Sequence, residues 1–217
     1  IPKKSLGQNF LIDKNILEKI SNITKIKNKN VLEIGPGTGQ LTNKLISKKP
    51  NILHLIEKDV ELFNSLKKKY KNNDIIKIYN DDALNFNYTN YKDLIVFSNL
   101  PFNIASKLII FFLKKNFFFS EFIFIIQKEV ADKIDINKNK KMNKLKFFIN
   151  ILANYSIKFQ ISKKLFYPKP KVNSTVVSIK PKNNNLIDKN KLYSFSNLIF
   201  QHKRKKLSNI LRYKNLN

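Results

Sequence analysis

The residues with the most specific chemistry lie in the segment Asn99-Leu100-Pro101-Phe102, directly after the apolar run 94–97. This run is short and rich in β-branched and aromatic residues, so it predicts a buried strand. Pro101 biases Leu100 toward an extended conformation and removes one N–H donor, which leaves carbonyl groups exposed at the strand end. Two acceptors beside an aromatic ring suit a planar base with an exocyclic amine. Taken alone, the segment is equally compatible with a plain strand-to-helix turn.

A glycine-rich loop, Gly35-Pro36-Gly37-Thr38-Gly39, separates a predicted strand (31–34) from a predicted helix that begins near Leu41. This order is typical of the opening of a nucleotide-binding α/β unit. The Gly-x-Gly-x-Gly spacing differs from that of dinucleotide sites, and the carboxylate of Glu33 would repel a pyrophosphate. The loop therefore favours a ligand with a positively charged end, such as S-adenosylmethionine, over NAD. A glycine-rich turn without a ligand is the alternative.

Acidic residues follow the next two predicted strands. Glu57 ends the strand 52–56, where a carboxylate can accept hydrogen bonds from both hydroxyls of a ribose. Asp82 follows the strand 75–79, where it could read an adenine amino group, and Asp81 competes for this role because a one-residue error in register would exchange them. In a parallel sheet the glycine loop, the two acids and Asn99 would fall on one edge, where open α/β sheets bind ligands.

The elements that must position these residues are predicted from apolar runs. Some of these runs are typical of strands and others have apolar residues at helical spacing. The chain predicts helices after Asp13 and Asp59, at 103–116 and 147–155, strands at 121–126, 157–161 and 172–179, and a last helix at 192–213. The strands 157–161 and 172–179 are expected to pair as a hairpin. We expect an α/β domain over residues 1–181 and a small, truncated helical domain over residues 182–217.

Composition bounds the function further. The formal charge of +27 predicts a polyanionic partner, although a chain rich in Lys, Asn and Ile could also reflect A/T-rich coding DNA. The lysine-rich loop 136–144 and the basic segment 203–206 are the candidate RNA contacts. The absence of Cys excludes a thiol nucleophile and Cys-based zinc sites, and no metal site is expected. We expect no membrane span, a monomer and a cytoplasmic location, with an organellar one left open because the chain starts at Ile1 and its N-terminus is expected to be trimmed.

Eight segments in order along the chain resemble the small-subunit (KsgA-type) family of ribosomal RNA adenine dimethyltransferases. They are Gly7-Gln8-Asn9-Phe10-Leu11, 33–39, 56–59, 82–84, 99–104, Gln127-Lys128-Glu129-Val130, 166–174 and 204–209. The resemblance implies a class I S-adenosylmethionine-dependent methyltransferase with a Rossmann-like sheet. It implies that the cofactor is bound by Gln8, Asn9, Leu11, Gly35, Gly37, Glu57, Asp82 and Asn99.

The resemblance also implies the catalytic residues and the reaction. Asn99 and the Leu100 carbonyl, with Pro101 shaping the turn, would hold the target amine, while Phe102 and Phe166 would sandwich the base. The expected reaction dimethylates two adjacent adenines in a 3′-terminal hairpin loop of small-subunit rRNA, on an immature subunit. The family usually has Tyr at the position of Phe102, and a Tyr-Gly-Arg-like segment is replaced by 142–144.

Two other functions compete with this interpretation. A large-subunit adenine methyltransferase of the macrolide-resistance type would share the fold and much of the 168–174 segment, but 7–11 and 127–130 favour the small-subunit type. A non-catalytic RNA-binding, ribosome-assembly or transcription factor on the same fold is the other alternative. It predicts decay of the cofactor residues, and these are intact.

Overall fold

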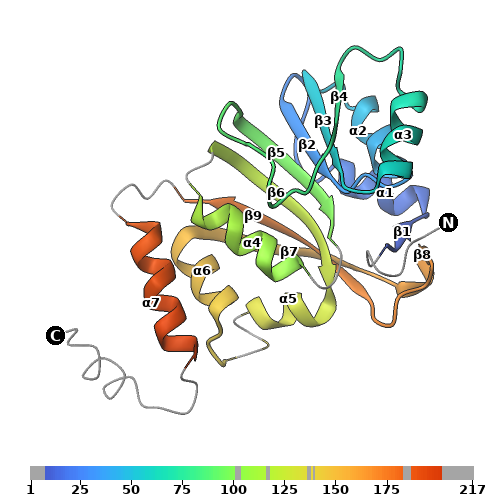
Figure 1. Cartoon of the computed structure of the whole chain (residues 1–217). Helices are drawn as coiled ribbons and strands as arrows, with labels where there is room; N and C mark the ends of the chain where they lie inside the picture. Colours follow the sequence, from blue (N-terminus) through green and yellow to red (C-terminus); the bar gives the residue numbers. More distant parts are fainter. Residues whose placement is uncertain are drawn as a thin grey trace.

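A seven-stranded sheet forms the centre of the structure, a computed structural model that describes residues 8–100, 104–115, 118–135, 138, 140–182 and 187–201. Its strand order is β4 (Ile76–Asn80), β3 (Ile52–Glu57), β2 (Asn30–Ile34), β5 (Lys92–Asn99), β6 (Phe118–Gln127), β9 (Ser174–Pro181) and β7 (Ala153–Ile161). The strands from β4 to β6 pair in parallel, and β9 runs antiparallel to both of its neighbours. Figure 1 shows this sheet crossing the molecule.

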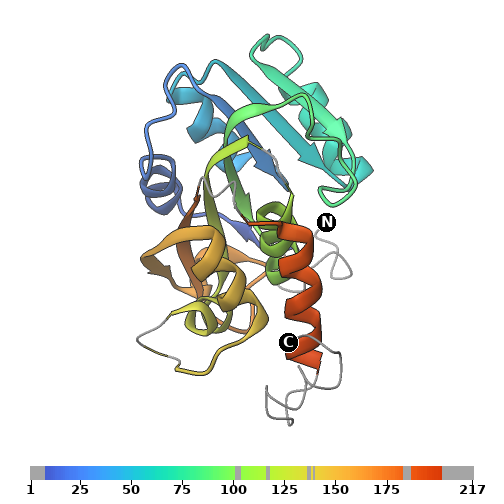
Figure 2. The ribbon, with the colours of Figure 1, turned by 90° about the vertical axis from the view of Figure 1, so that its left-hand side faces the viewer.

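Helices cover both faces of the sheet (Figures 1 and 2). The helices α1 (Lys14–Ser21), α2 (Gln40–Ser47) and α3 (Val60–Lys69) lie on one face, and α4 (Ala105–Lys114), α5 (Lys128–Ile134) and α6 (Lys144–Leu152) lie on the other. The last described helix, α7 (Lys189–Gln201), packs against α4 and α6. Each face of the sheet has its own cluster of buried side chains. The central strands can be buried on both faces because their sequences are continuous apolar runs.

The helix starts follow from the sequence. The Asp13 carboxylate accepts a hydrogen bond from Ile16 N at 2.8 Å and begins α1. Asp59 accepts from the backbone N–H groups of Glu61 at 2.9 Å and Leu62 at 3.1 Å and begins α3. Both carboxylates act as N-caps and satisfy donors that a first helical turn leaves unpaired, and both helices begin where the sequence predicts.

A two-stranded antiparallel ribbon lies beside the main sheet. β1 (Phe10–Leu11) pairs with β8 (Phe166–Tyr167), which follows the short 3₁₀ helix η2 (Lys163–Leu165). Leu11 and Phe166 are opposite each other and are both 4% exposed, so one face of the ribbon joins the core. The other face carries Phe10 and Tyr167, which are also directly opposite.

The structure confirms the α/β class, the parallel order of the first strands and the hairpin of β7 with β9. The helix expected over 147–155 ends earlier, because Ala153 to Tyr155 pair with Pro181 to Ile179 as the start of β7. Long-range pairing overrides the local helical pattern there. The helix expected at 192–213 begins at Lys189, and its second half lies outside the described residues. Among the helices that the structure describes, none has the length and apolarity to cross a membrane.

Candidate active site

Four neighbouring parallel strands end on the same edge of the sheet, as the sequence predicts. The glycine loop follows β2, Glu57 ends β3, Asp82 follows β4 by two residues and Asn99 ends β5. These strands are adjacent in the order β4-β3-β2-β5. The edge therefore gathers residues that are far apart in the sequence.

The glycine loop needs glycine for its backbone conformation. Gly35, Gly37 and Gly39 have φ angles of +65°, +59° and +77°, which L side chains rarely adopt. A Cβ at Gly37 would lie 2.6 Å from Cε1 of Phe10, whereas a Cβ at Gly35 would meet no atom within 4 Å. The loop is thus packed against Phe10 on one side and open at Gly35, where a ligand can approach the backbone.

Glu57 holds this loop through its carboxylate. One oxygen accepts from Gly37 N at 3.0 Å and the other accepts from Asp59 N at 2.9 Å, and the residue is 6% exposed. Burial raises the pKa of this carboxyl, and the backbone donors of Asp59 and Gly37 oppose the rise. Each oxygen retains capacity for a second hydrogen bond, as binding a diol would require.

Glu33 is a second buried carboxyl near the loop. It is 2% exposed and accepts a hydrogen bond from Thr42 Oγ1 at 2.6 Å. Burial raises the pKa of Glu33 to about 8, with a further contribution from the negative charge of Glu57. A ligand that brings positive charge to this place would favour the ionised form of Glu33, whereas a phosphate would favour its protonated form.

Asp82 is more exposed to solvent and is ion-paired. Its Oδ2 lies 2.8 Å from Lys58 Nζ, and its Oδ1 accepts from Leu84 N at 2.9 Å. Burial alone would raise the pKa of Asp82, but Lys58 and the Leu84 N–H outweigh it, so the pKa lies below its usual value. The competing residue, Asp81, instead accepts from Asp82 N at 2.7 Å.

The N-terminal segment 8–11 crosses the edge and contacts several predicted site residues. Gln8 Nε2 lies 3.4 Å from Asp59 Oδ2, and the Asn9 carbonyl accepts a hydrogen bond from Asn99 Nδ2 at 2.7 Å. Phe10 packs on Gly37. Residues predicted from widely separated motifs therefore lie at one place in the structure.

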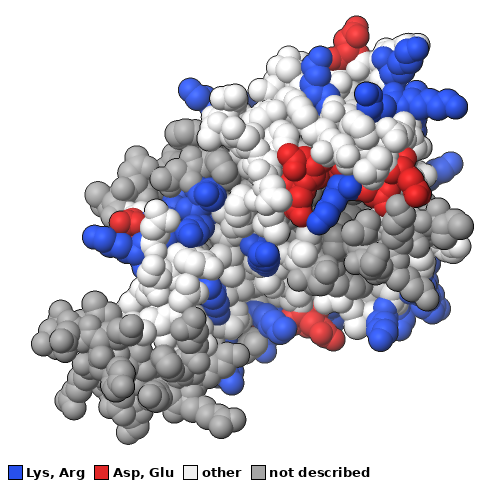
Figure 3. All heavy atoms as spheres, in the orientation of Figure 1, with Lys and Arg blue, Asp and Glu red and all other residues white. Residues whose placement is uncertain are grey.

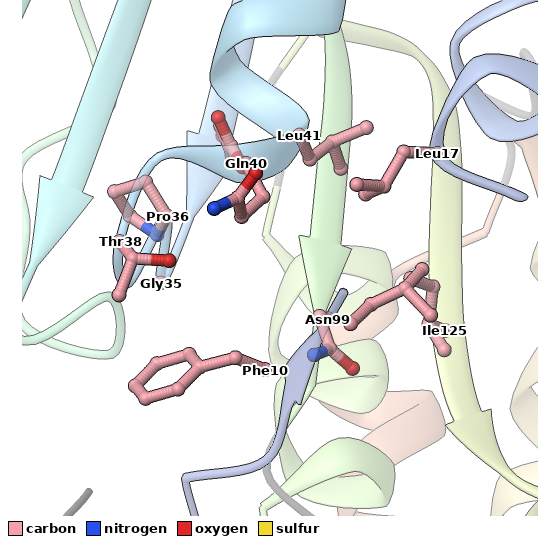
Figure 4. A pocket seen from close by; sticks show the side chains of 11 residues that line it. Phe10, Leu17, Gly35, Pro36, Thr38, Gln40, Leu41, Asn99 and Ile125 are labelled. Carbon is pink, nitrogen blue, oxygen red and sulfur yellow. The ribbon is translucent and has the colours of Figure 1, made fainter. Parts of the chain in front are cut away.

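A pocket with about 350 Å³ of empty space, part of it open to solvent, lies between this segment and the glycine loop (Figure 4). It is lined by Phe10, Leu11, Leu17, Glu33, Gly35, Pro36, Thr38, Gln40, Leu41, Asn99 and Ile125. Leu11, Gly35 and Asn99 were predicted as site residues. Sequence reasoning did not assign roles to Phe10, Leu17, Gln40 or Ile125, although Phe10 lies inside the motif 7–11. Glu57 and Asp82 stand at the neighbouring strand ends.

The orientation of the Asn99 amide is fixed by its donor bond to the Asn9 carbonyl. Within the described part of the chain no donor is bonded to Asn99 Oδ1, so this oxygen stays available as an acceptor at the pocket wall. Leu100 is 1% exposed, and its N–H donates to the Ile125 carbonyl at 3.0 Å. Pro101 and Phe102 lie outside the described residues. Phe166 is buried on the core face of the β1–β8 ribbon, and its stacking role stays a prediction.

The charge of the site differs from that of the surrounding surface. On the face in Figure 3, acidic side chains gather mainly near the start of α3 and the end of β4, and lysines are spread over the rest. An acidic pocket edge suits the sulfonium and amino groups of S-adenosylmethionine, and a basic surround suits a polyanion. The carboxylate acceptors at the strand ends, the open space at Gly35 and the local negative charge therefore fit this cofactor.

Comparison with known families and sequences gives a consistent result. The profile of the family described as ribosomal RNA adenine dimethylase matches residues 2–217. The chain is 41% identical over 214 residues to the ribosomal RNA small subunit methyltransferase A of Pelagibacter ubique (strain HTCC1062), covering 94% of this chain and 80% of that protein. It is also 41% identical over 212 residues to the protein of the same description from Mycoplasmopsis synoviae (strain 53), covering 95% and 80%.

Solved structures agree on the fold. A dimethyladenosine transferase from Plasmodium falciparum superposes with a TM-score of 0.82 at 26% identity, covering 95% of this chain and 76% of that one. The 23S rRNA methyltransferase ErmE superposes with a TM-score of 0.76 at 22% identity, covering 94% and 84%. This second likeness shows a shared fold only.

Proposed function

Because this chain belongs to the ribosomal RNA adenine dimethylase family, we propose that it methylates the exocyclic amines of two adjacent adenines in a 3′-terminal hairpin loop of small-subunit rRNA. It is an S-adenosylmethionine-dependent enzyme. The observation that carries the proposal is the position of Asn99. Its amide nitrogen is tied to the Asn9 carbonyl, and its oxygen remains an acceptor beside the glycine-loop pocket.

The edge formed by β2, β3, β4 and β5 would hold the cofactor, which would supply a methyl group on a sulfonium. In this proposal the Gly35 and Gly37 backbone lies against it, Glu57 accepts the ribose hydroxyls and Asp82 accepts from the adenine amine. Lys58 shields Asp82 in the structure, so Asp82 must exchange or share this partner on binding. Gln8, Asn9 and Leu11 complete the pocket from the N-terminal side.

The target amine needs activation because its lone pair is delocalised into the purine ring. Hydrogen bonds from its two N–H groups to Asn99 Oδ1 and the Leu100 carbonyl would favour a pyramidal nitrogen and direct the lone pair toward the sulfonium methyl. Catalysis is then positioning and electrostatic stabilisation, without a covalent enzyme intermediate. Stacking on Phe102 and Phe166 would offset part of the cost of unstacking the adenine.

The remaining parts of the proposal concern the oligomeric state, the location, the partner and the domain organisation. The chain acts as a monomer in the cytoplasm, on an immature small ribosomal subunit. Residues 1–181 are assigned to the methyltransferase domain, and residues 182–217 to an RNA-recognition region that includes α7. The start of that region is anchored, because the Tyr193 ring of α7 has Lys114 Nζ and Lys144 Nζ each 4.1 Å from its centroid.

Labelled S-adenosylmethionine tests the function directly. We expect label on two adjacent adenines of immature small subunits and little on naked large-subunit RNA. Asn99→Ala should lose most of this transfer while keeping most of its affinity for the cofactor and RNA, because the main contact of Asn99 forms with the attacking amine. Label on large-subunit RNA would favour the macrolide-resistance type. RNA binding without label on either substrate would favour a non-catalytic factor.

A further inference from the structure

Tyr167 is a large aromatic residue that the fold leaves open to solvent. It is 62% exposed, whereas the adjacent Phe166 is 4% exposed. The main core clusters account for Phe166 but not for Tyr167. Single exposed apolar residues are common on protein surfaces, so the role of Tyr167 must be argued from its position and its neighbours.

The strand register places this ring beside Phe10, a residue of the pocket wall. Tyr167 of β8 is directly opposite Phe10 of β1 in an antiparallel pair. Side chains at directly opposite positions share one face of the ribbon, with Cβ atoms about 4.5–5.5 Å apart. Phe10 lines the pocket and packs on Gly37, so Tyr167 extends the same aromatic face away from the pocket toward solvent.

The loop around Tyr167 is basic and has fixed anchor points. Lys164, Lys169 and Lys171 are exposed, and the sequence has no Asp or Glu between Asp135 and Asp188. The loop is closed on itself, because Lys163 Nζ donates to the Lys171 carbonyl at 3.1 Å and Lys163 N donates to Asn173 Oδ1 at 3.0 Å. In Figure 3, basic side chains lie at the lower right, where Figure 1 places β8 and the turn that follows it.

We infer that Tyr167 is a stacking platform for an unpaired base next to the target adenine, with Lys169 and Lys171 neutralising the phosphates of that strand. The inference rests on the proposed function, since it assigns a second subsite to the same RNA. An adenine that enters the pocket pulls its neighbours to the rim, where an aromatic face and lysines form the kind of surface that binds single-stranded RNA. Stacking tolerates any base, so this subsite would strengthen binding without selecting the sequence.

Substitutions at Tyr167 distinguish the contribution of the aromatic ring to RNA binding from the contributions of the hydroxyl group and of side-chain size. Tyr167→Ala and Tyr167→Leu should each weaken binding of a hairpin with unpaired adenines about 10-fold, and Tyr167→Phe should bind as the parent does. The KM for RNA should rise by a similar factor in the Ala and Leu variants, with kcat and the affinity for S-adenosylmethionine unchanged. The thermal midpoint should not move, because the side chain is exposed.

A fluorescent base locates the contact. With 2-aminopurine placed beside the target adenines, the parent and Tyr167→Phe should quench its emission on binding, and Tyr167→Ala should not. Lys169→Ala should reduce the log–log salt slope of RNA binding by about 1. Lys27→Ala, an exposed lysine just before β2 at the opposite edge of the sheet, should leave the slope unchanged.

Two results would overturn the inference. Parent-like RNA affinity and quenching in Tyr167→Ala would show that the ring contacts no base, and a loss of kcat with an unchanged KM would place the ring on the target adenine itself. Both readouts differ from a failure of the proposed function, which would appear as an absence of methyl transfer by the parent protein to small-subunit RNA.

Discussion

At the scale of single residues, Glu57 combines a proposed role in cofactor binding with an observed role in holding the glycine loop, and the sequence alone did not distinguish the two. Its carboxylate is proposed to accept the ribose hydroxyls, and in the structure it also accepts hydrogen bonds from Gly37 N and Asp59 N. Glu57→Ala should therefore abolish detectable cofactor binding and also lower the free energy of unfolding by about 1–3 kcal/mol, since it leaves buried donors unpaired. Calorimetric titration and denaturant unfolding measure the two effects.

Asp82→Ala is the comparison for this prediction. It should weaken cofactor binding less than Glu57→Ala, because Asp82 would read one amine and already shares its charge with Lys58. Unchanged cofactor affinity in Glu57→Ala would remove Glu57 from the cofactor site and leave it as a support of the loop.

Glu33 predicts a specific pH dependence of stability. Its pKa is raised from 4.5 to about 8, so the folded protein holds a proton that the unfolded chain releases, and stability falls as pH rises toward 8. The buried His54 acts in the opposite direction below pH 6.5, because burial lowers its pKa from 6.5 to about 4. Between pH 6.5 and 8 we expect the unfolding free energy to decrease with pH.

Glu33→Gln is the matched variant for this pH effect. The amide keeps an acceptor for Thr42 and cannot ionise, so the decrease should be shallower than in the parent across pH 6.5–8. Chemical denaturation at several pH values measures it. Equal slopes for the two proteins would mean that Glu33 is ionised in the folded state.

At the scale of elements, the glycine loop allows a comparison of two positions with the same backbone requirement. Gly35 and Gly37 both have positive φ, so alanine at either should cost about 1–2 kcal/mol of conformational strain. Only Gly37→Ala also displaces Phe10, 2.6 Å from the new Cβ. Gly37→Ala should thus be the less stable variant, while Gly35→Ala, whose methyl group enters the open space, should weaken cofactor binding with the smaller loss of stability.

A double-mutant cycle checks this explanation. In a Phe10→Ala background the extra cost of Gly37→Ala over Gly35→Ala should disappear, because the clashing ring is gone. If the difference persists without Phe10, the packing of this ring on the loop is not its cause.

Strands and helices with a clear local pattern were predictable, and so was the parallel pairing of the first strands, but the short β1–β8 ribbon was not. The loop from Gly35 to Gly39 follows a recognisable strand, Glu57 and Asn99 each end one, and the parallel sheet brings them to one edge. The pairing of Phe10 with Tyr167 joins opposite ends of the domain through only two residues in each strand. Such short strands have no period of their own to detect, so the burial of Phe166 and the exposure of Tyr167 could be known only from the structure.

At the scale of the whole molecule, the charge distribution divides the surface by function. The formal charge is +27, yet acidic side chains gather at the edge where the cofactor is proposed to bind. On the face in Figure 3, the lysines therefore do not extend evenly over the surface. In the proposed function the basic surface would attract RNA, and the acidic edge would suit the sulfonium of the cofactor better than a phosphate.

This distribution predicts opposite responses of folding and binding to salt. Self-repulsion among the lysines destabilises the compact state, and added ions screen it, so the thermal midpoint should rise between about 0.05 and 0.3 M NaCl. RNA affinity should fall over the same range, with a log–log slope of roughly −0.7 to −0.9 for each phosphate neutralised. Thermal melts and fluorescence anisotropy in matched buffers measure the two trends. A midpoint that falls with salt would show that ion pairs such as Lys58–Asp82 outweigh repulsion, and RNA affinity independent of salt would show that the lysines contact no phosphate.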